Sequence, residues 1–110
     1  MKNIEFIKTF SLGETVGIGK PKDVVEIFNG SRRRMVQVNL RSGEILSKHK
    51  ANEPITVFCL AGNGTFKAGP LLEDEQKLVA GTLITLEGGV EHEVIAEPEI
   101  SLLVTKFKAE

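Results

Sequence analysis

Residues 43–64 read GEILSKHKANEPITVFCLAGNG, and this stretch decides the expected fold. Gly43 is a turn glycine and is followed by a lone histidine, His49. Pro54 then marks a corner, because proline cannot continue a regular ladder of hydrogen bonds. The apolar run over residues 55–60 comes next and has the length of a buried strand.

The apolar run is expected to end in a turn at Ala61-Gly62-Asn63-Gly64. A shorter stretch, GTLITLEGGVEH, occupies residues 81–92. It also begins with a turn glycine, and it ends on the second histidine, His92. The two stretches together hold both histidines of the chain. We therefore expect any binding or catalytic site to lie between them.

Length and composition indicate one globular domain over residues 1–110. Hydrophobic residues make up 41% of the chain and charged residues 26%, which are values typical of folded proteins. The net charge of −1 forces no basic face. We therefore expect no nucleic-acid partner and no membrane partner.

The N-terminus and the cysteine content predict a cytoplasmic protein. Charged residues interrupt the apolar ones in MKNIEFIKTF, and no run approaches membrane-spanning length, so we expect neither a signal peptide nor a membrane anchor. Cys59 is the only cysteine, which rules out an internal disulfide and fits a reducing compartment.

The chain from residue 23 onward has a β pattern. Residues 24–28 and 33–40 flank Asn29-Gly30, a dipeptide typical of a two-residue hairpin turn. In the second segment Val36, Val38 and Leu40 alternate with polar residues, so one face is expected to be buried.

Roughly nine short strands are expected in all. The remaining ones are residues 4–10 (a strand or an arm), 55–60, 65–72, 76–80, 82–86, 91–96 and 100–107, with a break at Glu97-Pro98-Glu99. A short helix over residues 71–79 is the weaker alternative to the hairpin there. Many short strands with Gly, Asn and Pro between them favour a sandwich or barrel. We expect residues 1–22 to form an N-terminal arm or strands and residues 23–108 to form the barrel.

The two histidine stretches resemble the two cupin motifs, G-x5-H-x-H-x3or4-E-x6-G and G-x5-P-x-G-x2-H-x3-N. The matching residues are Gly43, His49 and Gly62 for the first motif and Gly81, Gly89 and His92 for the second. The resemblance covers about residues 35–107. It implies an all-β jelly-roll barrel, the double-stranded β-helix, with a pocket inside.

The chain departs from the cupin metal site. The resemblance implies a metal held by three histidines and a glutamate, of which only His49 and His92 match. Ala51 stands at the second histidine position and Ile55 at the glutamate position. Two imidazoles alone would bind a divalent ion such as Zn, Ni, Fe or Mn weakly.

Two residues are candidates to complete such a site. Glu53 precedes the lost glutamate position by two residues, although an exposed loop carboxylate is the more common outcome. Cys59 shares a strand face with Val57 by the period of two, although a buried apolar cysteine is more common than a ligand.

The predicted pocket combines the histidine pair with inward-facing strand residues. These are Arg34, Val38, Val57 and Cys59, beside His49 and His92. Arg34 shares the face of Val38 and could bind a carboxylate or phosphate, and its alternative is a solvated strand end. Without metal, the histidines could still contact an anionic or carbonyl-bearing ligand.

Three functions follow, in order of preference. The first is a binding module that holds a small molecule in the barrel. The second is a divalent-metal-dependent enzyme of the dioxygenase or isomerase type. The third is a structural dimer partner, since the cupin resemblance implies a homodimer formed through sheet edges.

Overall fold

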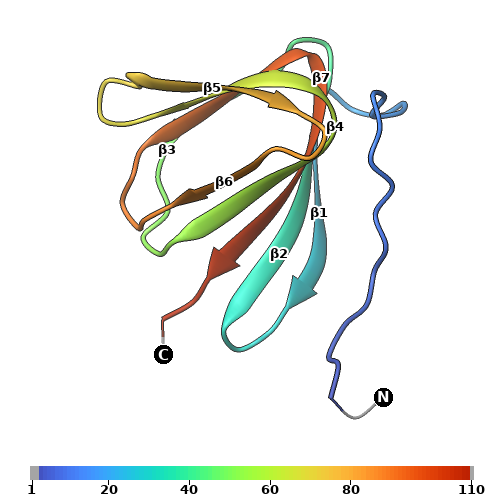
Figure 1. Ribbon diagram of the computed structural model, residues 1–110, viewed down its shortest axis with the longest axis vertical. Coiled ribbons are helices and arrows are strands. Elements are labelled where there is room, and N and C mark those ends of the chain that lie inside the picture. The colour runs from blue at the N-terminus through green and yellow to red at the C-terminus, as the bar shows by residue number, and fades with distance from the viewer. Residues whose placement is uncertain (1–2, 110) are drawn as a thin grey trace.

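The protein is all-β, as the sequence predicts. The computed structural model describes residues 3–109, and these contain seven strands and no helix (Figure 1). The strands are β1 (Lys22–Asn29), β2 (Arg33–Leu40), β3 (Ile45–His49), β4 (Ile55–Ala68), β5 (Asp74–Val79), β6 (Leu83–Leu86) and β7 (His92–Phe107). The described part of the chain therefore offers no helix that could cross a bilayer.

The strands form one antiparallel sheet that curls into a barrel. Its order is β1-β2-β7-β4-β5, with β3 also pairing with β7 and β6 with β4. The first part of β7 pairs with β3 and its last part with β2. The long strands therefore run through both walls of the barrel and join them (Figure 1).

The hairpin of β1 and β2 is confirmed, but its turn differs from the expectation. Asn29 pairs with Arg34, and the loop consists of three residues, 30–32, closed by a hydrogen bond from the Gly30 amide to the Arg33 carbonyl (2.9 Å). Neither Asn29 nor Gly30 has a positive φ angle, so the two-residue turn that Asn-Gly favours does not form.

The expected breaks within β4 and β7 are wrong. Both strands continue through their glycine-rich and proline-containing segments and pair with each other from Ile55↔Lys106 to Ala68↔His92. Register shifts between Cys59 and Ala61 and between Gly62 and Gly64 let the ladder bend without ending. Four of the nine expected strands thus merge into two.

Gly62 allows the backbones of β4 and β7 to approach at this bend. Its φ is +82°, a conformation that L-residues with a side chain rarely adopt. A Cβ atom at this position would overlap the Glu99 carbonyl oxygen of β7. The residue that looks like a turn signal in the sequence is therefore required by close contact between two strands.

Three further outcomes concern short segments. Residues 74–79 are strand β5, paired with β4 from Ala68↔Asp74 onward, so the hairpin is confirmed and the helix alternative is wrong. Residues 4–10 form no strand. Residues 45–49, which are not among the nine expected strands, form β3.

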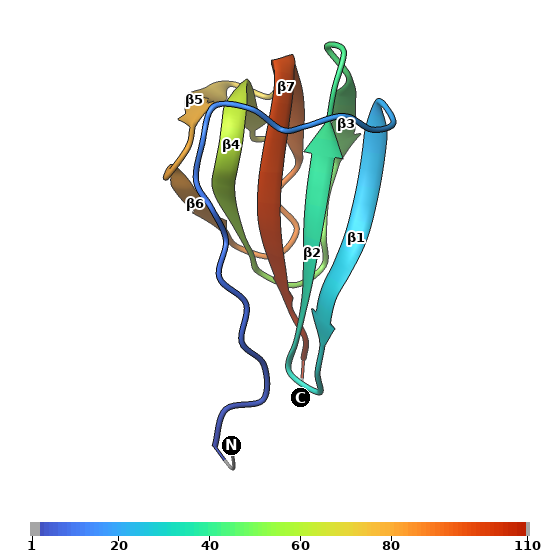
Figure 2. The same ribbon diagram turned by 90° about the vertical axis from the view of Figure 1, so that its right-hand side faces the viewer.

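Residues 3–21 run as an extended arm over the outside of the sheet (Figure 2). Gly13 forms a parallel bridge with Ala61 of β4. The Arg41 guanidinium donates hydrogen bonds to the Gly17 and Lys20 carbonyls, both at 2.9 Å. These contacts attach the arm to its own barrel at the β4 bend and at the end of β2.

We predict that Gly62→Ala destabilises the barrel strongly. A left-handed conformation for a residue with a side chain costs about 1–3 kcal/mol, and the overlap with Glu99 adds to this cost. Urea denaturation should show a loss in the free energy of unfolding of at least about 2 kcal/mol. Gly13→Ala is the control, since a Cβ there would meet nothing within 4 Å. Equal stability of the two variants would contradict the prediction.

Candidate functional site

The barrel encloses a cavity of about 330 Å³. Residues of β1, β2, β3, β4 and β7 line it, together with the loop that follows β3. Its deep part is apolar and buried and includes Val36, Val38, Ile55, Val57, Leu102 and Val104. A cavity of this size and character is typical of a small-molecule site.

The two histidines lie together in this cavity. His49 at the end of β3 pairs in register with His92 at the start of β7. Their ring centroids are 4.2 Å apart with an edge-on interplanar angle of 62°. Phe66 of β4 stacks on His92, with centroids 5.8 Å apart and planes 10° from parallel. The expectation that the two histidine stretches meet in space agrees with this geometry.

Backbone hydrogen bonds fix the same tautomer in both rings. His49 Nδ1 lies 2.8 Å from the Ser47 carbonyl oxygen, and His92 Nδ1 lies 3.0 Å from the Val90 carbonyl oxygen. A carbonyl oxygen only accepts, so both Nδ1 atoms must donate. Each neutral ring therefore keeps its lone pair on Nε2, the atom that remains to bind a ligand.

The two rings differ in their environment. His49 is exposed, whereas His92 is only 4% exposed. Burial lowers the pKa of His92, the hydrogen bond to Val90 opposes this in part, and electrostatic repulsion from His49 and Lys106 lowers the pKa further. His92 is therefore held neutral at a pH where an exposed histidine begins to protonate.

The donor set does not fit a divalent metal held by the protein alone. No group of three or more His, Cys, Asp or Glu side chains within residues 3–109 is placed to hold a metal ion. Three lysines, Lys22, Lys50 and Lys106, line the same cavity and repel a cation. Two imidazoles without a carboxylate would leave most coordination positions to water or to a ligand.

Four of the predicted pocket residues line the cavity, namely His49, His92, Val38 and Val57. Arg34 does not line it. Its side chain is 41% exposed, and its Nε donates to Glu26 of β1 at 2.9 Å. The alternative interpretation of Arg34, a charged residue at a solvated strand end, agrees better with this geometry.

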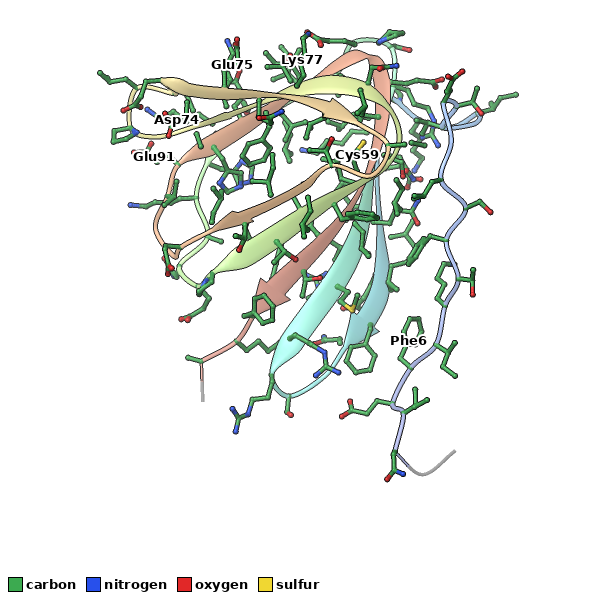
Figure 3. The ribbon with its side chains drawn as sticks, in the orientation of Figure 1. Phe6, Cys59, Asp74, Glu75, Lys77 and Glu91 are labelled. Carbon is green, nitrogen blue, oxygen red and sulfur yellow. The ribbon has the colours of Figure 1, made fainter. Side chains whose placement is uncertain are left out.

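Cys59 and Glu53 do not join the histidines either. Cys59 is fully buried in the core, where burial raises the pKa of its thiol and Sγ lies 3.6 Å from the Ala61 carbonyl oxygen. Figure 3 shows Cys59 on β4. Glu53 is exposed on the loop between β3 and β4. Neither lines the cavity.

None of the three cavity lysines is among the pocket residues predicted from the sequence. Lys106 follows Leu102 and Val104 at a spacing of two on β7, and Lys22 precedes Val24 at the same spacing on β1. Strand alternation would therefore have placed both on the inner face. Lys50 lies in the loop after His49, where no periodic signal exists.

Comparison with solved structures shows the fold. The barrel is similar to a cupin superfamily protein from Desulfitobacterium hafniense DCB-2, with a TM-score of 0.76 and 10% identity over 86% of this chain and 84% of that one. It is similar to an RmlC-like cupin protein from Desulfovibrio desulfuricans, with a TM-score of 0.73 and 19% identity over 91% and 95%.

A third similar structure is the DMSP lyase DddQ from Ruegeria pomeroyi DSS-3, with a TM-score of 0.72 and 14% identity over 82% of this chain and 48% of that one. No protein-family model matches the chain, and no curated protein matches its sequence. The structural likeness confirms the fold that the two motifs predicted, an all-β cupin-type jelly-roll barrel.

We predict that His92 makes stability fall at mildly acidic pH. Its folded pKa lies below the unfolded value of about 6.5, so the unfolded chain takes up the proton first. Its contribution is complete above about pH 6.5 and is lost as the pH falls from there toward the folded pKa. Urea denaturation at about pH 7.5 and 5.5 should show a steeper loss for the wild type than for His92→Gln. Equal slopes would contradict the prediction.

Proposed function

Since the chain forms a cupin-type barrel with an internal cavity, we propose that it is a binding protein for a small organic molecule. One observation supports this most directly. A cavity of about 330 Å³, open at its rim, is lined in its deep part by buried apolar side chains and includes two imidazoles with free Nε2 atoms. A core made only for stability would fill such a space, because voids cost packing energy.

The cavity supplies two kinds of interaction. Its apolar walls remove ligand surface from water, which contributes roughly 25 cal/mol per Å². The histidines supply polar contacts of fixed direction, because backbone carbonyls hold both rings. A mostly apolar pocket with a few oriented polar groups is how small-molecule sites gain affinity and specificity together.

A metal-dependent enzyme of the dioxygenase or isomerase type is the second candidate function. The close approach of the two rings favours it, because both Nε2 lone pairs are available. The ligand or solvent would have to supply the remaining donors, since the described protein residues do not. The similar structure from Ruegeria pomeroyi is named a lyase, which makes an enzyme worth testing on this fold.

We predict that filling the cavity abolishes ligand binding. In a thermal-shift screen of small organic molecules, at least one compound should raise the melting temperature, since a ligand at a hundred times its Kd stabilises by about 2.7 kcal/mol. Val38→Phe places a ring in the cavity and should remove that rise.

The control for this experiment is Val25→Phe, the same substitution at an exposed position on β1 that does not line the cavity. Val25→Phe should keep the ligand-induced rise in melting temperature. A stabilising compound that acts equally on both variants would contradict binding in the barrel.

We predict that untagged protein takes up divalent metal only weakly. Titration with Zn²⁺, Ni²⁺, Fe²⁺ or Mn²⁺, followed by dialysis and elemental analysis, should leave well under one equivalent, because residues 3–109 offer only two ligands at the site. The double variant His49→Ala, His92→Ala is the control. One equivalent retained by the wild type and lost from the variant would favour the enzyme instead.

A further inference from the structure

The lysines around the cavity indicate the chemical class of its ligand. Resting on the proposed binding function, we propose that the barrel takes an amphipathic organic anion. Its apolar body would lie in the cavity, and the positive charge of Lys22, Lys50 and Lys106 around the rim would attract its carboxylate head.

The three lysines come from segments far apart in the chain. Lys22 begins β1, Lys50 follows β3, and Lys106 lies near the end of β7. The fold nevertheless brings all three to the lining of one cavity. The chain as a whole has a net charge of −1, so this accumulation of positive charge reflects placement and not composition.

Within the described part of the chain, no acidic side chain pairs with these lysines. None of the cavity-lining residues is Asp or Glu, and none of the three lysines forms an ion pair with a carboxylate of residues 3–109. Other cations on the barrel are paired, among them Lys67 with Glu75 at 3.7 Å and Lys77 with Glu97 at 2.8 Å. Figure 3 shows the side chains of Glu75 and Lys77 pointing away from the barrel interior.

Burial divides the cavity into an apolar floor and a charged rim. The floor residues Val57, Leu102 and Val94 are at most 2% exposed. Lys22, Lys50 and Lys106 are all exposed, as is His49. Lys22 pairs with Leu40 of β2 and Lys106 pairs with Arg34 of β2, so the ammonium groups stand at separate points around the rim. A ligand that fills this space therefore meets hydrocarbon inside the cavity and positive charge around its rim, which suits an apolar acid.

The type of cation matters as well. A lysine ammonium is a point charge on a flexible stem and lacks the planar fork by which arginine fixes a carboxylate or phosphate. Three like charges around one space also repel one another, and an anion relieves that repulsion. We therefore expect the lysines to attract a ligand according to its charge and the salt concentration, with little dependence on the exact shape of its head group.

The experiment compares three probes that share one apolar body: hexanoate, 1-hexanol and hexylamine. Their binding is followed by the NMR shifts of the cavity methyl groups of Val38, Val57 and Leu102, at about pH 7.5 and low salt. Hexanoate should bind at least about tenfold more tightly than hexanol, a difference of about 1.4 kcal/mol, and hexylamine most weakly. Raising NaCl to about 0.5 M should reduce the advantage of hexanoate, since salt screens exposed charges.

The triple variant Lys22→Gln, Lys50→Gln, Lys106→Gln should bind hexanoate and hexanol equally. The control, Lys8→Gln, Lys67→Gln, Lys77→Gln, removes the same charge from residues outside the cavity and should behave as the wild type. Equal binding of hexanoate and hexanol by the wild type would overturn the anion assignment while leaving small-molecule binding in place. Absence of any shift at the cavity methyl groups with all three probes would count against both.

Discussion

The pairing of β4 with β7 is the constraint on which the rest of the structure depends. These two long strands stay hydrogen-bonded from Ile55↔Lys106 to Ala68↔His92, through two register shifts. Every other strand except β1 pairs directly with one of them. Because the shared ladder bends and does not break, one pair of strands contributes to both walls of the barrel and sets the width of the space between them.

The site is a consequence of that pairing. β7 begins at His92 and pairs there with both His49 of β3 and Ala68 of β4. Farther along, β7 turns Leu102, Val104 and Lys106 toward the same cavity. A single strand thus supplies one imidazole, much of the apolar floor and one of the rim cations. The polar and apolar parts of the site therefore hold a fixed relation to each other.

The sequence predicted the fold class and the meeting of the histidines, because both follow from the two histidine stretches and their turn glycines. The motif glycines Gly43, Gly62, Gly81 and Gly89 all have positive φ angles. Because glycine adopts this conformation more easily than other residues, it marks these positions in the sequence. The sequence did not predict that β4 and β7 are each one continuous strand. Gly62 and Pro98 look like strand ends, and only the position of the opposite strand shows that Gly62 permits a close approach.

The errors in the predicted site residues also arise from contacts between segments far apart in the chain. Lys22, Lys50 and Lys106 are more than twenty residues apart from one another, and no local pattern states that they surround one space. Glu53 was a candidate because it is near the motif in sequence, and Cys59 because it shares a strand face with Val57. The direction of each side chain excluded them, Glu53 toward solvent and Cys59 into the core.

The burial of Cys59 has a consequence for following the barrel in solution. It is the only thiol of the chain, it is fully buried, and it lies at the first register shift between β4 and β7. Reagents that modify thiols can reach it only when this crossing opens. The rate of alkylation under native conditions therefore reports how often the two central strands separate, without an introduced label. A molecule bound in the cavity should slow that rate, which gives an assay for occupancy built into the wild-type chain.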